Sequence, residues 1–437
     1  MIRNESNTSY PRNNFSFKRD QINRWLFPLT LLLLLFILPL GFLNEKAGRV
    51  TFYWCSYLSA VGILLNIRAF KSMLAASKMA VAGFSLALLF TLWSLVALYL
   101  SVPGEENGIL LTPAKRWFLA SLIALYIAWS ARQDIISKTV LYRLVWASLL
   151  AAFLLSSAYG IWQHLNGVVR ITLGINRATM SAYAFSAMSL ATIAMLSQIS
   201  SLKIKYFSVI LSSLLSVYIT FLSETRSAMV IHTLLALLLL LNILWCDKKL
   251  KLIPVLFIIA SVIAVLGLNR NIIDTRLETT RLELSRYQQG NDNTSLGSRF
   301  TLWKMGLITF AENPLGETQI TRNTIIREQL ADIKPRPYAL SFINVHLHNE
   351  FIQYASLFGI FGVLILAYFY ITMIFFNGMK TSFINPVTIM TFSALLYGMT
   401  DVLLTSIEYV VLLTTSLTLA NLYNIKLTSQ HSAPRES

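Results

Sequence analysis

Residues 344–362 read NVHLHNEFIQYASLFGIFG, and within them a long polar stretch gives way to an apolar run. The polar stretch reaches back to about Asn269 and is rich in Arg and Glu, whereas the chain on both sides consists mostly of apolar runs. The run that follows opens with Phe351 and carries Gly359 and Gly362. One large polar loop beside a helix that follows a histidine indicates an enzyme working at a bilayer surface.

The composition supports a membrane protein. Of the 437 residues, 55% are hydrophobic and 13% are charged, which is about half of the roughly 25% charged residues in soluble domains. The apolar runs reach the length of about 20 residues with which a helix crosses the roughly 30 Å core of a bilayer. We therefore predict an all-α polytopic membrane protein.

About twelve apolar runs are long enough to be transmembrane helices. They lie near 25–43, 51–67, 80–101, 117–131, 139–162, 178–199, 206–222, 228–246, 252–268, 351–376, 384–400 and 403–423. The chain then divides into a tail at 1–24, nine spans within 25–268, a large and partly helical loop at 269–350, three spans within 351–423 and a tail at 424–437.

Charge predicts the orientation of these spans. The formal net charge is +16, and the basic residues gather in alternate short connections, for example Arg68, Arg132, Lys203 and Lys248. Such a bias is typical of cytoplasmic connections, so it explains the positive charge without nucleic-acid binding. We expect both tails in the cytoplasm and the 269–350 loop on the outer side.

The loop itself contains two predicted helices. Between Arg276 and Arg286 the charges are spaced three and four residues apart with leucines between them, as on a helix surface. A polar break at 288–295 follows, and Arg299–Phe310 is again amphipathic until Asn313 and Pro314 end it.

His346 and His348 directly precede a span, and Asn349 and Glu350 follow them. A neutral imidazole near pH 7 suits a general base that takes a proton from a hydroxyl group. The alternative is a structural histidine at a helix end, where the interface tolerates a polar ring.

Two arginines are candidates for anion binding. Arg226 lies in a very short turn between two apolar spans, and an arginine drawn to the bilayer centre costs about 2.5–3.5 kcal/mol, so such residues are functional suspects. Snorkelling or pairing with Glu224 is the alternative. Arg226 and Arg299 together would suit a pyrophosphate ligand, because guanidinium groups bind phosphate oxygens in bidentate fashion.

Several common motifs are absent from the sequence. It contains no GxxxxGK[ST], no Gly-rich dinucleotide motif and no HExxH. We therefore predict no cofactor and no metal, an already activated donor, and arginines in place of a divalent cation.

Residues 220–365 resemble the O-antigen ligase family. The resemblance rests on Arg226 after a span, Arg299 with Trp303 four residues on, Asn313-Pro314-Leu315-Gly316, and His348-Asn349 followed by Gly359-x-x-Gly362. It implies a metal-independent glycosyltransferase of the bacterial inner membrane with its active site on the periplasmic face. The implied donor is O-antigen polysaccharide on undecaprenyl pyrophosphate, and the implied acceptor is a sugar hydroxyl of lipid A-core.

The resemblance also implies residue roles. His348 would activate the acceptor hydroxyl, Arg226 and Arg299 would bind the donor pyrophosphate, and Asn349 would orient the site. We expect Gly359 and Gly362 to allow close helix packing. The secondary candidates are Arg170, Arg177, His346 and Arg322.

Three alternatives remain open at this point. An O-antigen polymerase or a protein O-oligosaccharyltransferase uses a similar donor with a different acceptor. A transporter or flippase also fits about twelve spans, but its polar residues usually cluster near the middle of the membrane. Here they gather at one face around one loop.

Overall fold

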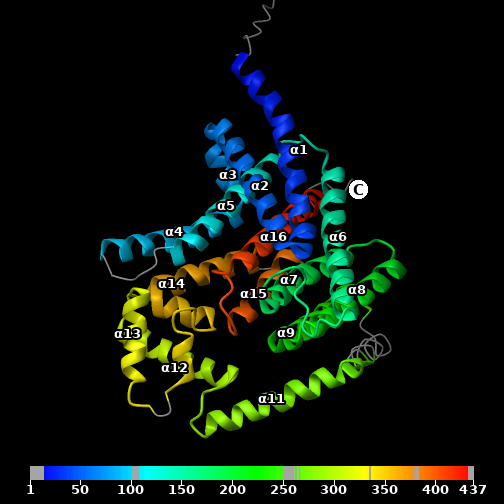
Figure 1. The fold of residues 1–437 in the computed structure, drawn as a ribbon. Coiled ribbons are helices and arrows are strands. Elements are labelled where there is room, and N and C mark those ends of the chain that lie inside the picture. Colours follow the sequence, from blue (N-terminus) through cyan, green and yellow to red (C-terminus); the bar gives the residue numbers. More distant parts are fainter. Residues whose placement is uncertain are drawn as a thin grey trace, which may run out of the picture.

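The computed structural model describes residues 14–100, 108–249, 266–333, 336–376 and 383–431, together with residues 260, 263, 264 and 378. Within these residues the chain forms helices and connections and contains no strand. Figure 1 shows a bundle of helices, with the segment around α11 to α13 gathered at one end of it. The predicted all-α class is confirmed.

Eight helices in the described part of the chain are long and apolar enough to cross a membrane. They are α1 (Asn14–Leu43), α4 (Lys78–Tyr99), α5 (Gly108–Ser130), α6 (Lys138–Leu165), α7 (Ala178–Leu196), α8 (Leu202–Leu222), α9 (Arg226–Cys246) and α14 (Glu350–Ile374). The protein is therefore an integral membrane protein.

Three further apolar elements correspond to other predicted spans. α2 (Glu45–Leu65) turns by 86° into a short segment made of η1 (Ile67–Ala69) and α3 (Phe70–Ala76). α15 (Pro386–Gly398) and the apolar part of α16 (Ile407–His431) are shorter than the eight spans. The predicted span near 252–268 lies largely outside the described residues.

α7 is the central helix of the bundle. Nearly all of its side chains are buried, and it contacts α6, α8, α9, α15 and α16. Its sequence, ATMSAYAFSAMSLATIAML, is rich in Ala and Ser, and small side chains let neighbouring membrane helices approach closely. The connection that leads into α7 ends at Arg177, the residue before its first turn.

The polar segment that follows α9 is mainly helical. It contains α11 (Arg270–Gln288), α12 (Ser295–Glu312), α13 (Gln319–Gln329) and η2 (Tyr338–Ser341), so the two helices predicted from charge and hydrophobic spacing are confirmed. Thr294 and Thr318 cap the N-termini of α12 and α13. A small apolar core joins α12, α13 and the residues that follow η2, and α12 packs against α14.

α14 is broken at Gly359. This glycine has φ 59° and ψ −150°, and a Cβ atom there would collide with the carbonyl groups of Pro314 and Leu315. The turn after α12 fills the break, because Glu317 N donates to Leu357 O over 2.8 Å and Ile360 N donates to Pro314 O over 2.9 Å. The two glycine-containing motifs therefore meet, and the missing Cβ atom of Gly359 allows a close approach, which here is to the turn after α12 at a break in α14.

Candidate active site

His346, His348 and Asp401 form one cluster. The histidines lie in the last residues before α14, and Asp401 lies in the connection between α15 and α16. Asp401 Oδ1 is 3.4 Å from His348 Nδ1 and 3.9 Å from His346 Nε2. The first distance is longer than a well-formed hydrogen bond, as is common for catalytic groups before a substrate binds.

The backbone at His348 is unusual. Its φ is +53°, a left-handed conformation that is uncommon for a residue with a Cβ atom and that tends to occur at functional sites. Its N–H group donates to His346 Nδ1 over 3.3 Å, and its carbonyl accepts from Trp303 Nε1 over 3.1 Å. These contacts hold the His348 ring beside Asp401. If His348 Nδ1 carries a proton toward Asp401, Nε2 is the nitrogen left to accept one.

The environment keeps Asp401 ionised. Burial by itself raises the pKa of Asp401, but its contact with His348 and the nearby positive groups outweigh burial, so the pKa lies below its usual value. His346 behaves differently, because burial lowers its pKa to about 4. At neutral pH the cluster therefore presents one carboxylate and a neutral His346 next to His348.

Arg299 approaches this cluster from α12. Trp303, four residues later on the same helix face, is the residue that binds the His348 carbonyl. Arg299 lines the same cavity as His348, and Trp303 on the same helix binds the backbone of that histidine.

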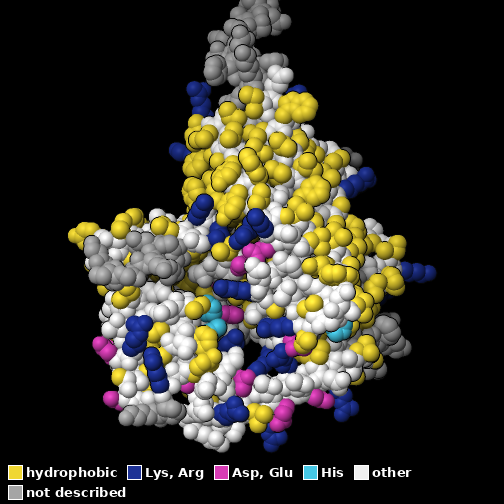
Figure 2. All heavy atoms as spheres, in the orientation of Figure 1, with side chains coloured by type: hydrophobic (Ala, Val, Ile, Leu, Met, Phe, Trp, Pro, Cys, Tyr) yellow, Lys and Arg dark blue, Asp and Glu magenta, His cyan; other side chains and the backbone are white. Residues whose placement is uncertain are grey.

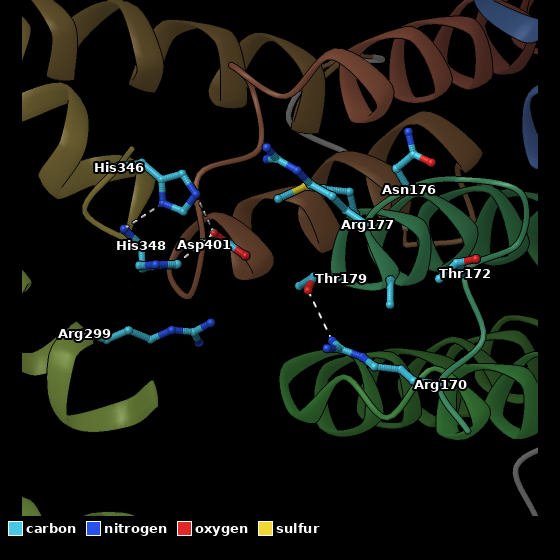
Figure 3. A pocket seen from close by; sticks show the side chains of 11 residues that line it. Arg170, Thr172, Asn176, Arg177, Thr179, Arg299, His346, His348 and Asp401 are labelled. Atoms are coloured by element: carbon cyan, nitrogen blue, oxygen red, sulfur yellow. Dashed lines mark hydrogen bonds and ion pairs between the residues drawn. The ribbon is translucent and has the colours of Figure 1, made fainter. Parts of the chain in front are cut away.

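A cavity of about 450 Å³ opens in front of these groups. Arg299, His346, His348 and Asp401 line one side, and the connection between α6 and α7 lines the other with Arg170 and Arg177 (Figure 3). Arg170 is held there by Ser223 O, at 3.0 Å from its Nε, and by the hydroxyl groups of Thr225 and Thr179. Three guanidinium groups therefore surround one cavity. Figure 2 shows several Lys and Arg side chains on the face of the molecule where His side chains are also visible.

Arg226 does not line the cavity. Its guanidinium group donates to both carboxylate oxygens of Glu283 on α11, over 3.0 and 2.6 Å. Glu224, the partner that we considered as a structural alternative, pairs with Arg276 instead. Of the three residues predicted from the sequence, His348 and Arg299 line the same cavity. Arg226 lies outside this lining and forms an ion pair with Glu283.

Comparison with known proteins agrees with the resemblance. A family model described as O-antigen ligase matches residues 211–367. The O-antigen ligase of Escherichia coli strain K12 is 25% identical over 236 residues, which are 54% of this chain and 55% of that protein. Residues 211–367 belong to the O-antigen ligase family. The chain spans about half the length of this relative, and Arg170, Arg177 and Asp401 lie outside the residues matched by the family model.

Arg322 and Asn349, two further residues predicted from the sequence, have clear contacts in the structure. Arg322 is fully buried on α13, where it binds Asn323 Oδ1, Ile343 O and Gln353 Oε1 away from the cavity lining. Asn349 caps α14 through Ile352 N at 3.1 Å and donates to Met399 O over 2.9 Å. It thereby touches the connection that carries Asp401.

Sequence reasoning missed Asp401. We placed it only in a turn between the last two predicted spans. The sequence indicates Asp401 in one way only: it is an acidic residue at the membrane edge among apolar residues. Placing a charge there is costly, and such residues often have a functional role. The sequence offered no way to connect it with a histidine 53 positions earlier.

The cluster also has the composition of a metal site. One ligand atom from each of His346, His348 and Asp401 lies within 4.8 Å of the others, and imidazole with carboxylate is a common ligand set. The sequence predicts no metal here, so the two interpretations differ in a measurable way.

Proposed function

We propose that this protein is a ligase that transfers O-antigen polysaccharide from an undecaprenyl-pyrophosphate carrier to a sugar hydroxyl of lipid A-core. The observation that carries this proposal is the position of His348 and Arg299 on one cavity, with Asp401 beside the histidine. A base and a group for binding phosphate oxygens are the two requirements of such a transfer.

In the proposed reaction the acceptor hydroxyl oxygen attacks the anomeric carbon of the donor. His348 takes the hydroxyl proton, the new glycosidic bond forms, and the bond between the anomeric carbon and the pyrophosphate oxygen breaks. The undecaprenyl pyrophosphate leaves with that electron pair. Asp401 holds the histidine ring and stabilises the imidazolium that forms.

The leaving pyrophosphate gains negative charge, and we propose that arginines stabilise it in place of a divalent cation. Arg299 is already on the cavity, and Arg170 and Arg177 face it from the other wall. Fixed charges in a site that excludes water are effective because they need no reorganisation during the reaction. Binding through Arg226 as well requires this side chain to exchange Glu283 for a phosphate oxygen.

We further propose that the reaction occurs at the periplasmic face of the bacterial inner membrane. The support is the position of the cavity between the ends of apolar helices and the polar segment that contains α11 to α13. Two substrates with lipid anchors can both reach such a place without leaving the bilayer.

The deciding experiment is a transfer assay with the purified protein, undecaprenyl-pyrophosphate-linked polysaccharide and lipid A-core. We expect the wild type and His164→Ala, which changes an exposed histidine at the end of α6, to produce a ladder of modified lipid A-core. His348→Ala should produce none. Lengthening of the donor without lipid A-core would identify a polymerase, and no product from a folded wild type would refute the proposal.

A further inference from the structure

Glu350 is a buried carboxylate in the first turn of α14, two residues after His348. Its Oε1 accepts from Leu404 N over 2.7 Å and from Leu403 N over 3.3 Å, and its Oε2 accepts from Tyr370 OH over 2.9 Å. A backbone N–H group buried at the edge of a membrane is costly when it has no acceptor. Glu350 therefore satisfies two donors that the connection between α15 and α16 cannot satisfy by itself.

This connection is the segment that carries Asp401. Its start is held by Asn349, which donates to Met399 O over 2.9 Å, and its later part is held by Glu350 and by Trp117 Nε1, which donates to Leu404 O over 2.8 Å. Gly398 makes the contact possible, because a Cβ atom there would lie 2.9 Å from Glu350 Oε2.

Three consecutive residues thus act on one connection. His348 faces Asp401, Asn349 binds the residue two positions before Asp401, and Glu350 binds the residues two and three positions after it. The carboxylate of Asp401 can stay at one distance from His348 only while the backbone on both of its sides is held.

We propose that Glu350 is a positioning residue that holds the 399–406 connection so that Asp401 stays against His348. This inference rests on the proposed function, in which His348 acts as the base. Glu350 does not line the cavity, so it acts through Asp401. Glu350 supplies a hydrogen-bond acceptor on a side chain long enough to reach the N–H groups of Leu403 and Leu404. Its negative charge matters less for this role.

Two substitutions separate length from charge. Glu350→Gln keeps the chain length and an oxygen for Leu403 N and Leu404 N, but removes the charge. Glu350→Asp keeps the charge but is one methylene shorter, so it cannot reach the backbone groups and Tyr370 together. We expect Glu350→Gln to retain kcat within about threefold, and Glu350→Asp to lose at least about tenfold, because small misplacements of reacting groups cost up to about 100-fold.

The measurement is kcat and KM for the donor in the transfer assay, with thermal melting of each purified variant. Loss in kcat with KM within about twofold is expected, and Asp247→Asn, which changes an ion pair with Lys205 between α8 and the end of α9, serves as the control. The double variant Glu350→Asp with Asp401→Asn should be no slower than Asp401→Asn alone, because both changes remove the same contact.

A higher kcat for Glu350→Asp than for Glu350→Gln would overturn the inference. It would also be overturned if the losses of kcat in the two single variants multiplied in the double variant. Unchanged kcat in Glu350→Asp would overturn it too. These outcomes are distinct from failure of the proposed function, in which wild type itself makes no product or His348→Ala retains full activity.

Discussion

Arg226 and Glu283 form a bidentate ion pair across 57 positions of the chain, with donor–acceptor distances of 3.0 and 2.6 Å. Glu283 also accepts from Leu296 N over 3.0 Å, so the carboxylate joins the start of α9, α11 and the start of α12. Burial by itself raises the pKa of Glu283, but the bonds from Arg226 and Leu296 outweigh it, and the pKa lies below its usual value. Glu283 is therefore ionised at neutral pH and competes with any anion for Arg226.

The first prediction concerns this competition. Arg226→Ala should lower kcat/KM on the order of 100-fold, as expected for loss of one charged group that stabilises the transition state. Glu283→Gln weakens the competing pair and should lower the KM for the donor about two- to fivefold, because partly exposed ion pairs are worth up to about 1 kcal/mol. Steady-state kinetics with varied donor concentration measure both. An unchanged KM in Glu283→Gln would show that Arg226 does not exchange partners.

The second prediction concerns Arg299. Arg299→Ala should lower kcat/KM on the order of 100-fold or more, and Arg299→Lys should recover less than about a tenth of the activity, because an ammonium group cannot form the bidentate contact. Arg281→Ala removes an exposed arginine from α11 and should leave the rate unchanged. Full activity of Arg299→Lys would mean that charge alone suffices at this position.

The third prediction concerns Asp401. Asp401→Asn keeps the shape of the side chain but removes the charge that orients His348, so kcat should fall about 10²- to 10⁴-fold. KM for the donor should change little, because the arginines remain. Asp274→Asn changes an exposed carboxylate on α11 and is the matched control. Equal kcat in the two variants would exclude Asp401 from the mechanism.

The fourth prediction concerns metal dependence. If arginines stabilise the leaving group, a chelator should leave the transfer rate unchanged, and the purified protein should contain no stoichiometric metal by elemental analysis. The cluster of His346, His348 and Asp401 has ligand atoms close enough for an ion, which makes the test informative. Loss of activity that a divalent cation restores would assign the cluster to a metal instead.

The fifth prediction concerns the pH dependence of stability. Burial raises the pKa of Glu317 from 4.5 to about 7, and its Oε1 is buried without a hydrogen-bond partner among the described residues. The folded state holds this proton more tightly than the unfolded state. The contribution of Glu317 to the free energy of unfolding is therefore complete below about pH 4.5 and is lost as the pH rises toward 7.

Glu317→Gln keeps an oxygen that can accept from Asn313 Nδ2, which donates to Glu317 over 3.2 Å, and cannot ionise. We expect this variant to melt at a higher temperature than the wild type at pH 8, with a smaller difference at pH 4.5. Thermal melting in detergent at several pH values measures it. The same difference at both pH values would show that Glu317 does not titrate in this range.

Much of the fold could be predicted because the signals are local. Apolar runs of membrane length correspond to helices in the described part of the chain, and the charge spacing between Arg276 and Arg286 corresponds to α11. Backbone groups in a bilayer must bond within their own segment, so hydropathy and length decide a span without reference to the rest of the protein. The break at Gly359 is different, because the turn that fills it comes from another part of the chain.

The candidate site divides in the same way. By itself, the sequence determined the membrane class, the polar segment after α9, and His348 and Arg299 as candidates, since polar groups next to apolar spans stand out from their neighbours. Only the tertiary structure decided that Asp401 lies against His348, that Glu283 holds Arg226, and that Glu350 binds the connection around Asp401. Those contacts join residues about 50 positions apart, and their distances depend on how whole helices pack, which no local pattern records.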